Sequence, residues 1–181
     1  QARILANAEA DFSELVGREG FLGSIFDEIL AEIAHEANAI LGRVPNTSRV
    51  VVRFRSEVVS EKGKAKRSIA AVVANDGHDE NPYTAALSGG QLSSFELAVD
   101  LAIIRVLSRR TGAMPGWLFL DEPFEGLGRV EKEAWIEVLK DYASDRLVVV
   151  VDHASETKDL FDSMIDVSFA GGVTTISQET T

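Results

Sequence analysis

The spacing of apolar residues predicts helices at the start of the chain and a β-hairpin after them. From 21 to 41 apolar residues recur at intervals of three and four, which predicts an amphipathic helix that stops at Gly42. Residues 1–16 carry a similar stripe without a start signal, as at the end of a helix that began elsewhere. Alternating apolar and polar residues over 49–59 and 67–74 predict a hairpin whose loop spans 60–66.

In the second half, helical and strand patterns alternate. Two short, fully apolar runs predict buried strands, at 117–120 and 147–151, and helical patterns precede and follow the first of them. We place Trp117 and Trp135 in the core. A short helix and two further strands complete the chain, and the predicted segments are 92–111, 130–143, 156–161, 164–170 and 173–177. This order predicts an α/β fold in which parallel strands are flanked by helices, with a β-hairpin added.

The sequence Leu87-Ser88-Gly89-Gly90-Gln91 stands where the helix over 92–111 begins. Free backbone N–H groups and the positive end of a helix dipole favour an anion there, and glycine permits its close approach. A plain turn is the alternative. Asp121 and Glu122 end the apolar strand at the edge of the predicted sheet, where α/β proteins bind ligands. Their alternative is a solvated strand end.

Composition limits the classes of function. The chain has 181 residues, of which 45% are hydrophobic, and no cysteine, so disulfides and thiolate metal sites are excluded in this segment. No apolar run is long enough for a membrane span. A net charge of −11 argues against a surface that coats nucleic acid, so any DNA contact must be local. The sequence also lacks a phosphate-binding P-loop, because its one Gly-Lys pair, Gly63-Lys64, has neither the preceding glycine nor the following hydroxyl residue.

Together, the Leu-Ser-Gly-Gly-Gln motif, the strand ending in Asp-Glu-Pro and the histidine after the second strand resemble an SMC-like ABC ATPase. The resemblance is to the C-terminal head segment of the SbcC type, which acts in DNA double-strand-break repair with a nuclease subunit. Residues 124–127 also look like phage and plasmid versions. The resemblance implies that 1–16 ends a returning coiled-coil helix and that 17–181 is the C-terminal half of a head, whose P-loop lies in an N-terminal segment.

The resemblance also implies cofactors, partners and residue roles. ATP and magnesium would be bound, and the partners would be the chain's own N-terminal head segment, a second head in a homodimer, an SbcD-type nuclease and double-stranded DNA, in the cytoplasm or nucleoid and without a membrane. Asp121 would hold magnesium, Glu122 would activate water and His153 would contact the γ-phosphate, although a histidine that merely caps the next helix is the alternative. The signature residues would contact ATP on the opposite head: Ser88, Gly89, Gly90 and Gln91.

Gly126, Leu127 and Gly128 match the loop that follows the Asp-Glu strand in the family. That loop normally ends in Asp, and here Gly128 stands in its place. The departure puts the coupling between two heads in doubt, unless Glu125 or Glu131 supplies the carboxylate.

A basic cluster lies around the predicted hairpin loop, with Arg53 and Arg55 nearby, and it consists of Lys62, Lys64, Lys66 and Arg67. It is either a solvated hairpin tip or a contact for DNA phosphates. The same residues fit two functions: a repair ATPase that gates a nuclease, and a structural DNA clamp of the SMC or RecN type without one. Pro123 after Glu122 favours the first.

Overall fold

The computed structural model describes residues 21–61, 64–75, 80–144, 146–153 and 155–180, so the predicted helix over 1–16 lies outside the described residues. The helices are α2 (Phe21–Leu41), α3 (Tyr83–Ala86), α4 (Gly89–Thr111) and α5 (Arg129–Ala143), and the 3₁₀ turns are η1 (Pro45–Thr47) and η2 (Ser155–Leu160). The strands are β1 (Val50–Glu61), β2 (Lys64–Asn75), β3 (Asn81–Pro82), β4 (Trp117–Asp121), β5 (Leu147–Val151), β6 (Ser163–Ala170) and β7 (Val173–Thr180).

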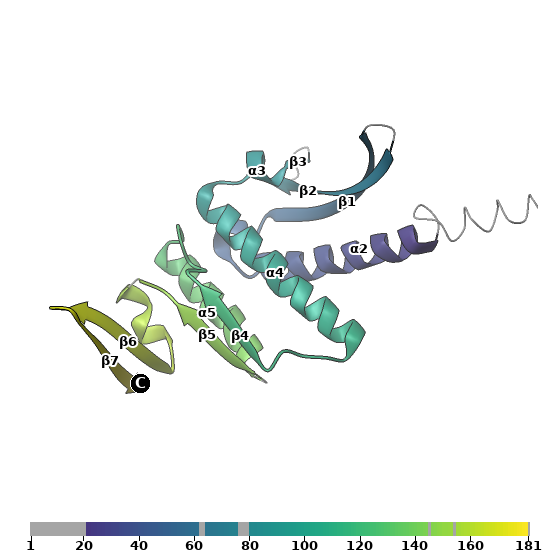
Figure 1. Cartoon of the computed structure of the whole chain (residues 1–181). Coiled ribbons are helices and arrows are strands. Elements are labelled where there is room, and N and C mark those ends of the chain that lie inside the picture. The colour runs from purple at the N-terminus through teal and green to yellow at the C-terminus, as the bar shows by residue number, and fades with distance from the viewer. Residues whose placement is uncertain (1–20, 62–63, 76–79, 145, 154, 181) are drawn as a thin grey trace, which may run out of the picture.

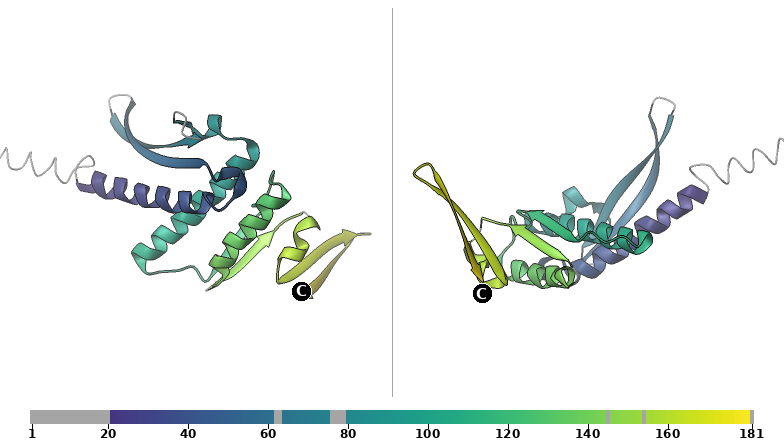
Figure 2. Two further views of the ribbon diagram at one scale, coloured as in Figure 1. Left: turned by 180° about the vertical axis from the view of Figure 1, so that it is seen from behind. Right: turned by 60° about the horizontal axis from the view of Figure 1, so that its bottom comes forward.

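The α/β fold predicted from the sequence is confirmed, with a parallel pair and antiparallel strands (Figure 1). α4 crosses α2, the β1–β2 hairpin projects beside them, and α5 lies against the parallel pair β4–β5. The antiparallel hairpin β6–β7 stands at the opposite end of the molecule from β1–β2, as the turned views also show (Figure 2). None of the described helices combines the length and the apolar character that a membrane crossing needs.

α2 covers the free edge of β1 through one side chain. The amide of Asn38 accepts a hydrogen bond from the Val52 N–H at 2.7 Å and donates one to the Val52 carbonyl at 3.0 Å. It therefore replaces a neighbouring strand at this point of an otherwise open edge. The core continues between α2, α4 and α5, where Leu41, Leu101 and Trp135 are fully buried.

The parallel pair β4–β5 is covered on one face. The face that turns toward α5 packs on the core through Leu118, Leu120 and Val150. On the other face, Trp117 is 66% exposed and Phe119 is 55% exposed. The expectations that 117–120 and 147–151 are fully buried strands and that Trp117 lies in the core are therefore wrong, because Leu147 is exposed as well and no described residue covers the outer face. Trp135, by contrast, is in the core as predicted.

Some boundaries also differ from the prediction. β1 and β2 run on to Glu61 and Lys64, so the hairpin loop is shorter than the 60–66 expected; cross-strand pairing continues through the polar residues that suggested a loop. The short helix expected over 156–161 is present as the 3₁₀ helix η2, Ser155–Leu160. The three segments η1, β3 and α3 were not predicted, because each is too short to show a periodic pattern.

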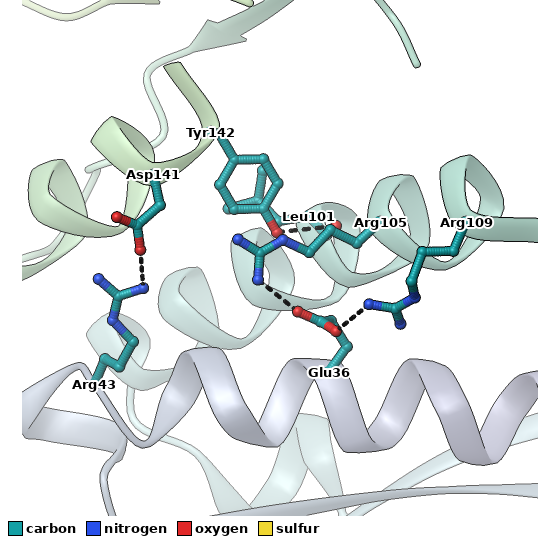
Figure 3. A network of polar contacts seen from close by, with 7 residues as sticks. All are labelled: Glu36, Arg43, Leu101, Arg105, Arg109, Asp141 and Tyr142. Carbon is teal, nitrogen blue, oxygen red and sulfur yellow. Dashed lines mark hydrogen bonds and ion pairs between the residues drawn. The ribbon is translucent and has the colours of Figure 1, made fainter. Parts of the chain in front are cut away.

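An ion-pair cluster joins α2 to α4 (Figure 3). Glu36, whose side chain is 10% exposed, accepts hydrogen bonds from Arg105 at 2.6 Å and from Arg109 at 2.8 Å. The Arg105 guanidinium also stacks 4.3 Å from the ring centroid of Tyr142 on α5. Burial raises the pKa of Tyr142 to about 12, so its hydroxyl stays neutral and donates to the Leu101 carbonyl.

We expect Glu36→Gln to destabilise the chain in a pH-dependent way. Burial, the largest single influence, raises the pKa of Glu36, but the two arginine contacts together outweigh it and leave the pKa below its ordinary 4.5. The carboxylate therefore stabilises the fold above pH 4.5, and this contribution is lost as the pH falls through the lowered pKa. At pH 7 the variant should lose about 1–3 kcal/mol in urea unfolding. The difference in the free energy of unfolding between the variant and wild type should become smaller below pH 4.5.

The control for this variant is Glu137→Gln, which removes the exposed Glu137–Lys140 pair on α5. It should change the free energy of unfolding by less than about 0.5 kcal/mol. A Glu36→Gln penalty that stays constant from pH 7 to pH 3 would contradict the assignment of the effect to the charged carboxylate.

Candidate functional site

Ser88 and Gln91 set the start of α4. Ser88 is the N-cap residue, and its N–H donates to Gln91 Oε1 at 3.1 Å. Gln91 Nε2 in turn donates to the Asn46 carbonyl in η1 at 2.8 Å. Ser88 and Gly89 are exposed, and apart from the adjoining residues and the helix backbone nothing lies within 4 Å of the position that a Gly89 Cβ would take. This helix start is therefore open for an anion to approach its N–H groups.

Gly90 has a different environment from Gly89. A Cβ at Gly90 would lie 2.9 Å from the Gly126 carbonyl oxygen and 3.6 Å from the Leu127 Cδ2. Glycine is required here by close packing within one chain. The contact also brings the signature sequence against the loop that follows the Asp-Glu strand.

Glu122 and His153 meet beyond the ends of the parallel strands. The Glu122 N–H donates to the Val151 carbonyl at 2.8 Å, which extends the β4–β5 ladder by one bond. Glu122 adopts φ +48°, a left-handed conformation that costs a non-glycine residue about 1–3 kcal/mol. His153 Nε2 lies 2.8 Å from Glu122 Oε1, and both side chains face solvent, 84% and 46% exposed. The structure thus brings these two predicted site residues together.

Asp121 is the last residue of β4 and is exposed. No hydrogen bond or ion pair from a described residue occupies its carboxylate. A free carboxylate at the carboxyl end of a parallel strand fits the oxygen ligand that magnesium prefers. The described residues contain no cluster of acidic and histidine side chains that could hold a metal by themselves.

The loop from Gly126 to Gly128 leads into α5. Gly126 has φ +73°, which favours glycine. Gly128 is the N-cap residue of α5, and Glu131 Oε2 lies 2.6 Å from the position that a Gly128 Cβ would occupy. Glu125 and Glu131 were the two residues that could supply the carboxylate missing at position 128. In the structure the Glu131 side chain folds back toward this position.

The basic cluster is only partly described. Lys64, Lys66 and Arg67 lie in β2 near the end of the hairpin, and Lys62 lies outside the described residues. Arg53 and Arg55, the neighbouring basic residues, both form ion pairs with Glu80. These two arginines therefore offer less positive charge than the sequence suggested.

Sequence reasoning missed the polar residues behind the signature helix. Ser94 is fully buried, and its hydroxyl accepts a hydrogen bond from Trp135 Nε1 at 3.1 Å and lies 3.5 Å from Asn46 Oδ1. The sequence did contain a signal for this contact, because Ser94 lies on the apolar face of an amphipathic helix. A buried hydroxyl there requires a hydrogen-bonding partner.

No family model matches the chain. Two curated proteins are similar to the chain in sequence, and both are named DNA double-strand break repair Rad50 ATPase. The one from Archaeoglobus fulgidus is 26% identical over 153 residues, which cover 84% of this chain and 16% of the relative. The one from Aeropyrum pernix is 30% identical over 142 residues, which cover 77% of this chain and 14% of the relative. The chain thus corresponds to a small part of each.

The chain is a C-terminal head segment of the SMC/Rad50-like ATPase family. Solved structures of SMC heads agree with its fold. A chain from a study of ATP-driven dimerization and DNA-stimulated activation of SMC ATPases superposes with a TM-score of 0.65 at 16% identity, over 87% of this chain and 89% of that one. An Smc head bound to the C-winged helix domain of ScpA gives 0.63 at 18% identity, over 83% of this chain and 43% of that one.

The two signature glycines of this head segment should respond differently to alanine. Gly89→Ala enters open space in a helix and should leave stability unchanged or raise it by up to about 1 kcal/mol. Gly90→Ala must push back the Gly126 backbone and should cost about 1–3 kcal/mol. Urea unfolding of the two variants measures both effects, and equal stabilities would contradict the packing assigned to Gly90.

Proposed function

We propose that this segment is the C-terminal half of an ATP-hydrolysing head that acts in DNA double-strand-break repair. An N-terminal head segment supplies the P-loop, and two completed heads close on ATP. The observation that carries the proposal is the joint placement of three elements in one segment: the open start of α4, the free Asp121 at the sheet edge, and the Glu122–His153 contact.

The need for an N-terminal segment is supported by the uncovered face of β4–β5. Parallel sheets are normally covered on both faces, and here Trp117, Phe119 and Leu147 are exposed on the outer one. The hairpin β6–β7 also carries exposed Ile165 and Phe169, and a hairpin alone is marginally stable. A segment with further strands would cover these surfaces and bring its P-loop to the carboxyl ends of β4 and β5.

In the completed site, Asp121 would provide an oxygen ligand for magnesium, together with phosphate oxygens and water. Magnesium, when bound, neutralises charge on the phosphates. Glu122 would accept the proton of the attacking water, a role worth about 10²–10⁴ in rate. His153 holds Glu122 in the free segment, so it would have to release this carboxylate when it turns to the γ-phosphate.

Ser88, Gly89 and the N–H groups at the start of α4 would bind the γ-phosphate of ATP held by the opposite head. Gln91 stays inside its own chain, where both ends of its amide are hydrogen-bonded, and would orient this turn rather than contact ATP. ATP then acts as the link between two heads.

The repair function is favoured by the names of the relatives, which specify double-strand break repair. Its link to a nuclease subunit is favoured by Pro123 after Glu122. A structural DNA clamp without a nuclease is the second candidate, and it is favoured by the fold shared with Smc heads. Co-purification of the completed head with an SbcD-type nuclease distinguishes the two.

Glu122→Gln should trap the closed head dimer. The amide keeps the size of the side chain but cannot accept the proton from water, so hydrolysis by the completed head should fall by about 10²–10⁴. ATP should still bind, and light scattering should show more ATP-dependent dimer than for wild type. Ser88→Arg should prevent that dimer while ATP binding to the P-loop side persists.

The 181-residue chain without its N-terminal segment is the control, and it should not hydrolyse ATP. Wild-type turnover by Glu122→Gln in the completed head, or a dimer that forms equally well without nucleotide, would show that this half-site is assigned wrongly.

Replacing Lys64, Lys66 and Arg67 together by Ala should weaken DNA binding by the completed head. Each lost phosphate contact removes the release of about one counterion, so the plot of log affinity against log salt should become less steep. Arg53→Ala is the matched control, because Glu80 already pairs with this arginine. An unchanged salt slope in the triple variant would show that the cluster is a solvated hairpin tip and does not contact DNA phosphates.

A further inference from the structure

We propose that Asn46, Ser94 and Trp135 form a positioning bracket that holds the signature turn of α4 in the orientation needed to bind ATP across the head dimer. The inference rests on the proposed function. It concerns residues outside the signature sequence, from η1, α4 and α5, none of which would touch the nucleotide.

The bracket is a continuous line of hydrogen bonds. Trp135 Nε1 donates to the Ser94 hydroxyl at 3.1 Å, and this hydroxyl lies 3.5 Å from Asn46 Oδ1, to which it donates. The carbonyl of the same Asn46 accepts from Gln91 Nε2 at 2.8 Å, and Gln91 Oε1 accepts from the Ser88 N–H. α5 is thereby connected to Ser88 through the side chains of Trp135, Ser94 and Gln91 and through Asn46.

Burial gives the line its rigidity. Trp135 and Ser94 are both fully buried, so a helix shift that separated them would leave an indole N–H and a hydroxyl without partners. The position of α4 along α5 is therefore fixed near its N-terminal turn.

Asn46 is itself held in place. Its neighbour Thr47 is fully buried, and the Thr47 hydroxyl lies within hydrogen-bonding distance of the carbonyls of Leu41, at 3.1 Å, and Val44, at 3.3 Å. Asn46 Nδ2 also lies 3.6 Å from the position of a Gly90 Cβ. The end of α2 therefore supports the same turn that α5 fixes from the other side.

The test uses Ser94→Ala and Trp135→Phe, which each remove a hydrogen-bonding group of the bracket. Two controls each remove a buried polar group from the same helix as the variant that they match. Ser108→Ala removes a buried hydroxyl near the far end of α4, and Tyr142→Phe removes a buried donor of α5 that bonds to α4 at Leu101. A general loss of stability would appear in variants and controls alike.

In the completed head, the two bracket variants should raise the head concentration for half-maximal ATP-dependent dimerisation by about five- to tenfold, the effect of one lost hydrogen bond. ATP binding to the single head and the turnover of the dimer at saturating head concentration should stay as in wild type. The controls should leave all three quantities unchanged.

Amide hydrogen exchange in the 181-residue chain provides a readout independent of ATP. Exchange from 92 to 95 should quicken in Ser94→Ala and Trp135→Phe, while exchange from 104 to 107 should not. If the unsubstituted completed head fails to dimerise with ATP, the proposed function fails, and the exchange data alone decide whether the bracket exists. Bracket variants that match their controls in dimerisation and exchange would overturn the inference.

Discussion

A parallel pair of strands needs cover on both faces, and this constraint explains most of what is unusual about the segment. The inner face of β4–β5 meets α5 and the core through Leu118, Leu120 and Val150, while Trp117 and Phe119 remain outside. The strand pair carries Asp121, Glu122 and His153 at its carboxyl end. The candidate catalytic groups therefore lie on a strand pair with one uncovered face, and under the proposed function the segment that covers this face would also complete the site.

The Glu122–His153 contact follows from the register of these strands. Asp121 pairs with Val151, the Glu122 N–H still bonds to the Val151 carbonyl, and His153 follows two residues later. The left-handed conformation of Glu122 ends the strand while this last ladder bond is kept. The strained backbone of Glu122 is thus held by its bond to Val151, and its side chain is held by the imidazole of His153.

The sequence was sufficient for elements whose pattern is long and whose caps are clear. The helix over 21–41 and the signature helix agree with the structure, because periodic apolar positions and the glycines Gly42 and Gly112 mark them. The bounds of the strand over 147–151 agree as well, because its apolar run is uninterrupted. The exposure of Trp117 could not be predicted, since an apolar run does not reveal whether its cover lies in the same chain. The Ser94–Trp135 bond and the role of Asn46 depend on contacts between distant segments, which no local pattern encodes.

In the loop after the Asp-Glu strand, the carboxylate of Glu131 lies close to position 128, where the family normally has an aspartate. An aspartate at 128 would be the N-cap residue of α5, and glycine there has no side chain to bond the free N–H groups of the first turn. Glu131, one turn further on, folds back until its Oε2 reaches the space of the absent Cβ. A negative charge near a helix N-terminus is favoured by the helix dipole, so this arrangement is stable for α5 by itself. The charge consequently lies at the N-terminus of α5, 2.6 Å from the position that a Gly128 Cβ would take.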